Sequence, residues 1–370
     1  MIRLSKETQK RKADHIRISL DRDVQARGAT TGFEDVHFIH RALPEIDRDE
    51  IDLSTTVFNH RFKAPIIIGA ITGGTDEAAK INATIAEVVE EFGIGMGVGS
   101  QRAAMEDSKL EKTFAIVRKK APDAFLIANI GAVQLVNGFG LKQVEKAIQM
   151  INADAVAFHL NSLQEAVQPE GQTNFRGILS KISEIADELD KPVIAKETGA
   201  GIAAEEAMKL EKAGVEGIDV SGVGGTSFAA VEHYRRKWSP NPSTDSLGEV
   251  FWDWGIPTAT SIVEVSRSTK LEVIGSGGVR SGIDVAKAIA LGSRLASSSQ
   301  PVLRAAVKGS RETSKLISRV MDELRNAMFL AGAKSVNDLH KEPLIIMGKT
   351  AERLSLRGFD VSSYALRGRK

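Results

Sequence analysis

From residue 65 to residue 300 the chain alternates short apolar runs with longer amphipathic stretches. Short apolar runs of this kind, bounded by glycine and polar residues, are typical of buried β-strands. Counting them gives the architecture, because each run starts a new strand–helix unit. The eight expected strands span 65–70, 94–98, 125–130, 155–160, 192–196, 217–220, 271–274 and 294–298.

The stretches between the strands carry apolar residues at three- and four-residue spacing, which predicts helices. Ile81, Ile85 and Val88 illustrate this spacing, and glycine follows several stretches, as at Gly93 and Gly292. Repeated strand–helix units indicate a parallel sheet, and eight of them favour a closed (β/α)8 barrel, a TIM barrel, over an open doubly wound sheet. The expected helices span 76–92, 108–120, 141–151, 178–189, 203–213, 258–268 and 281–291.

Two segments lie outside this repeat. Residues 1–63 form an N-terminal extension, in which 36–39 and 55–58 are expected to pair as a hairpin, and we expect the extension to cover the active site and the barrel bottom. Residues 64–370 then form the barrel with its C-terminal helices. Residues 222–255 are a long insertion after strand six that contains Pro240, Pro242, Trp238, Trp252 and Trp254. It is either a lid over the catalytic face or a packed, inert excursion.

Composition narrows the function classes. The 49 basic and 48 acidic residues leave a net charge of +1, so no global field draws the chain to nucleic acid or to an anionic membrane. No apolar run approaches the roughly 18 residues of a spanning helix, and residues 1–22 do not resemble a secretory signal. The absence of cysteine excludes disulfides and thiolate nucleophiles. We therefore expect a cytoplasmic protein without nucleic-acid or membrane partners.

Glycine-rich turns follow strands six, seven and eight. Residues 275–282 follow strand seven and open a helix, where exposed backbone N–H groups and the helix N-terminus favour a phosphate. In barrels, phosphates commonly bind between the loops after strands seven and eight. The turns 221–226 and 296–301 lie beside the same corner, which indicates a phosphorylated cofactor; a tight turn without a ligand is the alternative.

Polar residues at the other strand ends suggest the rest of a site. Lys196 ends strand five, where it would point inward toward an anionic ring or form an ion pair with Glu197 or Asp219. After strand four, His159, Asn161, Gln164 and Glu165 fall within one turn, and a carboxylate there is suited to Mg²⁺ shared with a substrate phosphate. If the extension folds over the barrel mouth, a basic cluster at its start binds a diphosphate together with Arg102. That cluster consists of Arg11, Lys12 and His15.

Taken together, these motifs resemble the type 2, FMN-dependent isopentenyl-diphosphate delta-isomerase family over nearly the whole chain. The segments that carry the resemblance are Arg11-Lys12 with His15, 64–66, 72–74, 96–102, 159–165, 168–171, 196–197, 253–258 and 275–282. The resemblance implies interconversion of isopentenyl and dimethylallyl diphosphate in isoprenoid biosynthesis, with reduced FMN, Mg²⁺, and NADPH or NADH as reductant. It also implies a homotetramer or homo-octamer.

Carried over position by position, the resemblance assigns residues to each ligand. FMN would be held by Ala70, Ile71, Thr72, Ser100, Asn129, Lys196, Ser221, Thr226, Gly278, Val279, Arg280, Ser299 and Gln300. Substrate would contact Arg11, Lys12, His15, Ser100, Gln101, Arg102, His159, Asn161 and Gln164, and Glu165 would hold Mg²⁺. Gln164, Lys196 and His159 form the expected catalytic group. Because an amide is a poor acid, we expect the flavin to carry the proton and Gln164 to orient it.

The chain departs from the family after strand eight, where Ser297, Ser298, Ser299 and Gln300 replace an apolar run, and at Phe228, where tryptophan is common. Packing of the barrel interior and FMN affinity are the properties that this change would affect. Two other function classes compete. A true flavin oxidoreductase needs a base beside its hydride donor, and a flavin- or phosphate-binding scaffold would not need the cluster after strand four.

Overall fold

The computed structural model describes residues 2–238 and 247–368. Within these residues, eight parallel strands close into a barrel in the order β10-β11-β4-β5-β6-β7-β8-β9. Each expected strand is present, which confirms the (β/α)8 fold and rules out the open sheet. The barrel strands are β4 (Ile66–Ile68), β5 (Gly95–Gly97), β6 (Phe125–Gly131), β7 (Ala155–Leu160), β8 (Val193–Glu197), β9 (Gly217–Asp219), β10 (Glu272–Ser276) and β11 (Leu295–Ser298).

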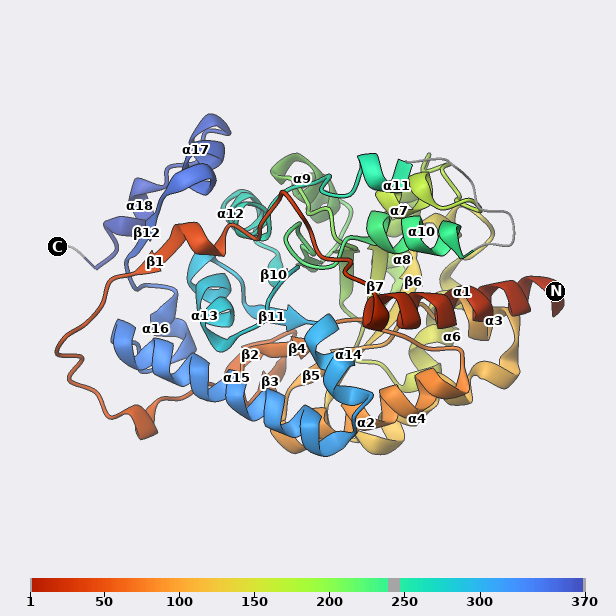
Figure 1. Cartoon of the computed structure of the whole chain (residues 1–370), viewed down its shortest axis with the longest axis horizontal. Helices are drawn as coiled ribbons and strands as arrows, with labels where there is room; N and C mark the ends of the chain where they lie inside the picture. Colours follow the sequence, from red (N-terminus) through yellow and green to blue (C-terminus); the bar gives the residue numbers. More distant parts are fainter. Residues whose placement is uncertain (1, 239–246, 369–370) are drawn as a thin grey trace.

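Helices follow each strand and surround the barrel (Figure 1). Local sequence sets their ends: Thr75 caps the first by accepting from the Ala78 backbone N–H, and Gly93 ends it with a φ of 60°. The surrounding helices are α2 (Asp76–Phe92), α3 (Arg102–Glu106), η3 (Ser108–Leu110), α4 (Lys112–Lys120), α5 (Ala132–Leu135), α6 (Leu141–Ile151), α7 (Ser162–Val167), α8 (Ile178–Glu188), α9 (Ala204–Lys212), α12 (Thr258–Ser268), α13 (Gly282–Leu291), α14 (Gln300–Ala306) and α15 (Ser310–Ala331).

The expected hairpin between 36–39 and 55–58 is wrong. Instead, β1 (Val36–Phe38) pairs antiparallel with β12 (Leu344–Ile346), near the other end of the chain. β2 (Thr55–Val57) pairs with its neighbour β3 (His60–Phe62) through a two-residue turn. Both turn residues, Phe58 and Asn59, have positive φ, as tight hairpins require. Alternating polarity predicts that a segment is a strand, but it cannot identify the partner when that partner lies about 300 residues away.

The N-terminal extension contacts both ends of the barrel. The β2–β3 hairpin packs Phe62 and Phe58 against Phe125 at the start of β6, with ring centroids 5.4 and 5.8 Å apart. These rings join the apolar cluster inside the barrel, which includes Ile67 and Ile194. At the opposite end, α1 (Ile2–Asp21) runs beside α3 and α10 (Phe228–Lys237), as Figure 1 shows. The extension therefore seals the amino ends of the strands and also reaches their carboxyl ends.

The insertion after strand six supplies α10 and α11 (Leu247–Val250). α10 and α1 share a small apolar cluster in which Trp252 is buried, and the Trp252 indole N–H donates to the Gln25 carbonyl at 2.8 Å. Trp238 packs against this cluster, whereas Trp254 is 62% exposed. Pro240 and Pro242 lie outside the described residues. The C-terminal part adds α16 (Val336–Leu339), α17 (Gly348–Leu356) and α18 (Ser362–Ala365). In the N-terminal extension, η1 (Phe33–Asp35) contacts α17, and η2 (Arg48–Glu50) contacts α15.

The helices of residues 2–238 and 247–368 include none whose length and apolar character would let it cross a membrane.

Candidate active site

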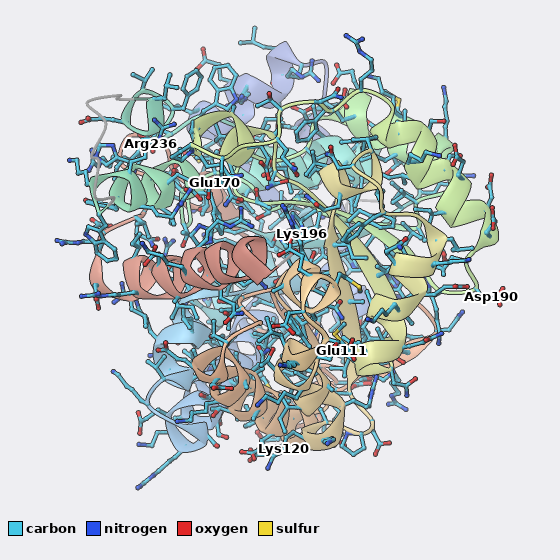
Figure 2. All side chains as sticks on the ribbon, turned by 90° about the vertical axis from the view of Figure 1, so that its right-hand side faces the viewer. Glu111, Lys120, Glu170, Asp190, Lys196 and Arg236 are labelled. Carbon is cyan, nitrogen blue, oxygen red and sulfur yellow. The ribbon has the colours of Figure 1, made fainter. Side chains whose placement is uncertain are left out.

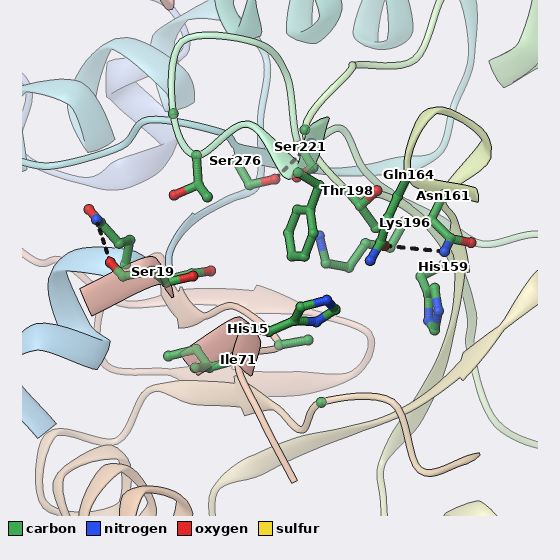
Figure 3. Close-up of a pocket in the computed structure, with 18 of the residues that line it drawn as sticks. His15, Ser19, Ile71, His159, Asn161, Gln164, Lys196, Thr198, Ser221 and Ser276 are labelled. Atoms are coloured by element: carbon green, nitrogen blue, oxygen red, sulfur yellow. Dashed lines mark hydrogen bonds between the residues drawn. The ribbon is translucent and has the colours of Figure 1, made fainter. Parts of the chain in front are cut away.

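One large cavity opens at the carboxyl ends of the strands. α1 contributes His15 to it and α10 contributes Phe228, and Figure 3 shows His15 reaching into the space bordered by Lys196 and Gln164. Figure 2 shows Lys196 near the middle of the molecule, far from peripheral residues such as Asp190. The sequence-predicted residues that line the cavity are Arg11, Lys12, His15, Ala70, Ile71, Thr72, Ser100, Arg102, Asn129, His159, Asn161, Gln164, Glu165, Lys196, Ser221, Thr226, Gly278, Val279, Arg280, Ser299 and Gln300.

Gln101 is the exception. It is fully buried behind the cavity wall, where its amide N–H donates to the Ala147 carbonyl at 2.8 Å and its oxygen accepts from the Asn129 backbone at 2.9 Å. Both ends of the amide are therefore occupied by the scaffold. Gln101 therefore does not line the cavity, where a substrate contact was expected of it, and it braces the strand that carries Asn129.

The glycine-rich turns after β9 and β10 meet edge to edge. Gly277 and Gly278 have φ of 101° and 73°, a region that favours glycine. A Cβ on Gly225 would lie 2.4 Å from the Gly278 nitrogen, so the two backbones touch. Ser281 and Asp284 cap the helix that follows, α13. Exposed backbone N–H groups beside a capped helix N-terminus form a cup suited to a phosphate group.

Serines at the end of β11 and directly after it fit this wall. The Ser298 hydroxyl donates to the Val279 carbonyl at 2.8 Å, which ties β11 to the phosphate cup. A Cβ on Gly69 would lie 2.3 Å from the Ser299 hydroxyl and 2.9 Å from that of Ser297. The glycine that follows β4 thus leaves room for the two hydroxyls, which shows how the barrel accommodates these polar residues.

His159 is held as a neutral imidazole. Its Nδ1 lies 2.9 Å from Asn129 Oδ1, and the Asn129 amide N–H donates to the Val98 carbonyl, so the oxygen faces the histidine. Nδ1 is therefore the protonated nitrogen. Burial, and then the charges of Lys196 and Lys12, lower the pKa of His159 to about 3. The residue can accept a hydrogen bond or a proton at Nε2, but it brings no positive charge to the cavity.

Lys196 forms its ion pair with Asp219, not with Glu197. Its Nζ lies 3.3 Å from Asp219 Oδ2 and donates to the Glu197 carbonyl at 2.7 Å. The Glu197 carboxylate instead accepts the backbone N–H groups of residues 198–200 at 2.5 to 2.6 Å. Burial nevertheless raises the pKa of Glu197 to about 7. Lys196 thus forms an ion pair and also lines the cavity, where it can face an anionic ring. The two roles expected for it are compatible.

Sequence reasoning missed Glu232 of α10. Its fully buried carboxylate accepts from His15 Nε2 at 2.9 Å, Gln164 Nε2 at 3.0 Å and Arg235 Nε at 2.5 Å. Burial alone would raise the pKa of Glu232, but His15 and Arg235, with the Gln164 amide, bring it to about 2. One carboxylate therefore joins α1, α7 and α10 around Gln164. Nothing in the sequence marks Glu232, because an acid among basic residues on a helix is usually solvated.

The surroundings of Glu165 fit a hard cation. Its carboxylate accepts from the amides of Asn161 at 3.0 Å and Gln168 at 2.5 Å. The oxygens of those two amides, Asn161 Oδ1 and Gln168 Oε1, are buried without a hydrogen-bond partner. Within the described residues there is no cluster of three or more acidic, histidine or cysteine ligands. One carboxylate with two free amide oxygens matches Mg²⁺ that also takes water and substrate phosphate as ligands.

The basic cluster of α1 faces the same cavity. Lys12 donates to the Ser100 carbonyl and lies 5.0 Å from the Phe114 ring centroid, while Arg11 lies 3.8 Å from Glu170. Arg102 is paired with Glu106 at 2.8 Å. Burial, and then the charge of Arg11, lower the pKa of Lys12 to about 7, against the opposing effect of Glu106. Arg11, Lys12 and Arg102 are thus held close together. Their mutual repulsion is unfavourable in the free protein, and a bound anion would offset it.

A pH-dependent affinity follows from the pKa of Lys12. Below pH 7 Lys12 is charged and attracts a diphosphate; above it the free protein loses that charge, so binding must take up a proton. We expect the Kd of inorganic diphosphate to rise by up to about tenfold per pH unit above pH 7, as measured by calorimetry. Lys12→Arg, which stays charged, is the control and should flatten this rise. An equally steep rise in the arginine variant would show that another group is responsible.

The fold and the cavity together define a flavin-type α/β barrel. The model of the FMN-dependent dehydrogenase family matches residues 4–117 and 137–346. Solved structures with this fold include a lactate oxidase from Pediococcus acidilactici, with a TM-score of 0.66 and 18% identity over 93% of this chain and 94% of that one. A mandelate oxidase with (S)-2-phenylpropionate has a TM-score of 0.61 and 19% identity over 92% and 98%.

Sequence relatives are more specific. Isopentenyl-diphosphate delta-isomerase of Methanosarcina barkeri is 49% identical over 361 residues, which cover 98% of each chain. The protein of the same name from Pyrococcus furiosus is 49% identical over 359 residues, 94% of this chain and 89% of that one. The chain therefore belongs to the FMN-dependent, type 2 isopentenyl-diphosphate delta-isomerase family.

Proposed function

We propose that this protein interconverts isopentenyl and dimethylallyl diphosphate, with FMN in its reduced form, as a step of isoprenoid biosynthesis. The observation that carries the proposal is the pairing, in one cavity, of a glycine-rich phosphate cup with a separate basic cluster from α1. A phosphorylated cofactor and a diphosphate substrate need two such anion sites. The names of the full-length relatives support the same reaction.

The residues around the cavity divide between cofactor and substrate. The backbone N–H groups of Gly277 and Gly278 bind the FMN phosphate, and Lys196 presents its ammonium to the ring. When bound, reduced FMN supplies an electron-rich ring and a nitrogen able to carry a proton. Arg11 and Lys12 would hold the diphosphate, so that the hydrocarbon tail faces the apolar side chains of Ile71 and Phe228, which line the same cavity. His159, whose Nε2 can only accept, would contact the diphosphate through a water molecule or a protonated oxygen.

The reaction adds a proton to the terminal carbon of the double bond and removes one from the carbon on the other side of the central carbon, so it needs positioned groups and little water. Gln164 is held by Glu232 on one side and by Asn161, at 3.3 Å, on the other. Fixed at both ends, its amide orients the reacting groups and does not itself supply the proton. α1 and α10 form the cover that excludes water from this corner.

Further parts of the proposal concern partners and setting. NADPH or NADH would supply the electrons that reduce the flavin, and Glu165 would hold Mg²⁺ near the diphosphate. The enzyme works in the cytoplasm as a homotetramer or homo-octamer, which analytical ultracentrifugation can test. The insertion after β9 acts as a lid, supported by the contact of its buried Glu232 with His15 and Gln164.

The decisive experiment incubates the purified protein with FMN, NADPH and Mg²⁺ under anaerobic conditions and follows double-bond migration by NMR. We expect many substrate molecules to convert for each flavin reduced. One acceptor consumed per turnover would indicate a dehydrogenase instead. Bound FMN with no conversion of either diphosphate would defeat the proposal and leave a flavin-binding scaffold.

The metal site can be tested through Glu165. Glu165→Gln removes the charged oxygen ligand of the proposed site, and even loss of a group that only orients a metal ligand typically costs about 10- to 100-fold in metal affinity. We expect the Mg²⁺ concentration for half-maximal activity to rise by about that factor. Glu188→Gln, at the exposed end of α8, is the matched control. An unchanged Mg²⁺ requirement in Glu165→Gln would place the ion elsewhere.

A further inference from the structure

A polar row crosses four neighbouring barrel strands at the catalytic end. His159 of β7 pairs in register with Lys196 of β8, and Lys196 pairs with Asp219 of β9. Ser276 at the end of β10 adds its hydroxyl to the Asp219 carboxylate. From the sequence, Asp219 was one of two possible ion-pair partners of Lys196, and Ser276 had no expected role of its own. Both are buried, at 6% and 5% exposed.

The hydrogen bonds of this row converge on the Asp219 carboxylate from both sides. The Ser221 backbone N–H donates to the Ser276 hydroxyl at 2.8 Å, and that hydroxyl donates to Asp219 Oδ1. Asp219 Oδ2 then pairs with Lys196 at 3.3 Å. The chain begins at a strained residue, because Ser221 has a φ of 38°, a conformation that non-glycine residues rarely adopt. Strain held in place by the surrounding structure is typical of a functional site.

The Lys196 ammonium has one N–H donor that the polar row does not use. An ammonium has three N–H donors. One is taken by the Glu197 carbonyl and one faces Asp219, so a single donor remains for a ligand in the cavity. Both oxygens of Asp219 are engaged as well, one by Ser276 and one by Lys196. The carboxylate therefore fixes where the ammonium sits and balances its charge, while it does not itself line the cavity.

We propose that Asp219, oriented by Ser276, is a positioning residue. It fixes where the Lys196 ammonium sits, and its negative charge reduces the positive field of Lys196 at the bound flavin ring. The inference rests on the proposed FMN site and extends it, because it names the group that tunes the ring electrostatically. Reduction adds electrons to the ring, so a nearby cation favours the reduced form. Asp219 moderates that preference by neutralising part of the field of Lys196.

The test compares the affinities of oxidised and reduced FMN, which together fix the midpoint potential of the bound flavin. Asp219→Asn keeps the shape of the side chain and removes its charge. We expect the ratio of the reduced to the oxidised Kd to fall about tenfold, since one unit charge is no longer balanced. For a two-electron couple this is a rise of about 30 mV in the potential. Lys196→Met should move the potential in the opposite direction.

Two further variants separate charge from position. Asp219→Glu keeps the charge but displaces the carboxylate by one methylene, so we expect a potential near that of the parent protein and a lower kcat. Ser276→Ala removes the orienting hydroxyl without changing charge. We likewise expect a potential near that of the parent protein and a lower kcat. Asp154→Asn, whose carboxylate pairs with Arg118 at 2.8 Å outside the cavity, is the matched control and should leave the potential unchanged.

The outcomes distinguish this inference from the proposed function. If Asp219→Asn binds FMN with an unchanged potential, or shifts it in the same direction as Lys196→Met, the inference fails while the isomerase proposal stands. If the parent protein binds no FMN in either oxidation state, the proposed function itself fails. A Ser276→Ala variant with parental kcat would show that the hydroxyl does not orient Asp219 and would overturn that part.

Discussion

Glu232→Ala should lower kcat/KM by about a hundredfold or more and should also destabilise the protein. The buried carboxylate is the common acceptor for His15, Gln164 and Arg235. Its loss leaves Arg235 without one partner and frees both His15 and Gln164 to rotate. Breaking a buried pair costs about 3–5 kcal/mol, and loss of positioning in an active site is of similar size. NMR rates and thermal unfolding measure the two effects.

A buried glutamate outside the cavity separates stability from activity. Glu264 is 1% exposed and pairs with Arg357 at 3.0 Å. We expect Glu264→Ala to lower the unfolding temperature while the folded fraction retains its kcat/KM. Equal losses of kcat/KM in Glu264→Ala and Glu232→Ala would mean that Glu232 stabilises the fold and has no separate role in activity.

Gly225→Ala should weaken FMN binding by about a hundredfold with little change in the fold of the apoprotein. The added Cβ would lie 2.4 Å from the Gly278 nitrogen, and this overlap between backbones is relieved only when the phosphate cup opens. A hundredfold change is about 2.7 kcal/mol, near the upper end of what overpacking costs. Flavin fluorescence titration of the apoprotein measures the Kd.

The control is an alanine at a glycine with free space. A Cβ on Gly140, at the start of α6, would have its nearest neighbour at 3.9 Å. Gly140→Ala should therefore keep the parental Kd. If Gly225→Ala also binds FMN with the parental Kd, the two turns do not form the phosphate site.

The strands and helices were predictable because they depend on local periodicity. Even boundaries matched where caps are local, as at Thr75 and Gly93 of α2. The hairpin of the extension failed for the opposite reason. β1 finds its partner in β12, and no local pattern in Val36–Phe38 distinguishes that edge from any other.

Some residues of the candidate site could likewise be predicted from local sequence, and others could not. Residues at the carboxyl ends of strands, such as His159 and Lys196, could be placed at one rim because parallel strands all end there. Glu232 lies in the middle of a helix within an insertion, and its burial depends on α1 folding over α10. Gln101 follows a strand as expected, yet packing turns its side chain to the Ala147 carbonyl.

The sequence by itself therefore determined the barrel, the rim on which the chemistry lies and the family. Only the tertiary structure decided which groups meet there: Asp219 with Lys196, Glu232 with His15 and Gln164, and Asn129 with the neutral His159. The physical reason is that periodicity and turn chemistry act over a few neighbouring residues. Hydrogen bonds and ion pairs between side chains depend instead on distances between segments far apart in the chain, and packing alone sets those distances.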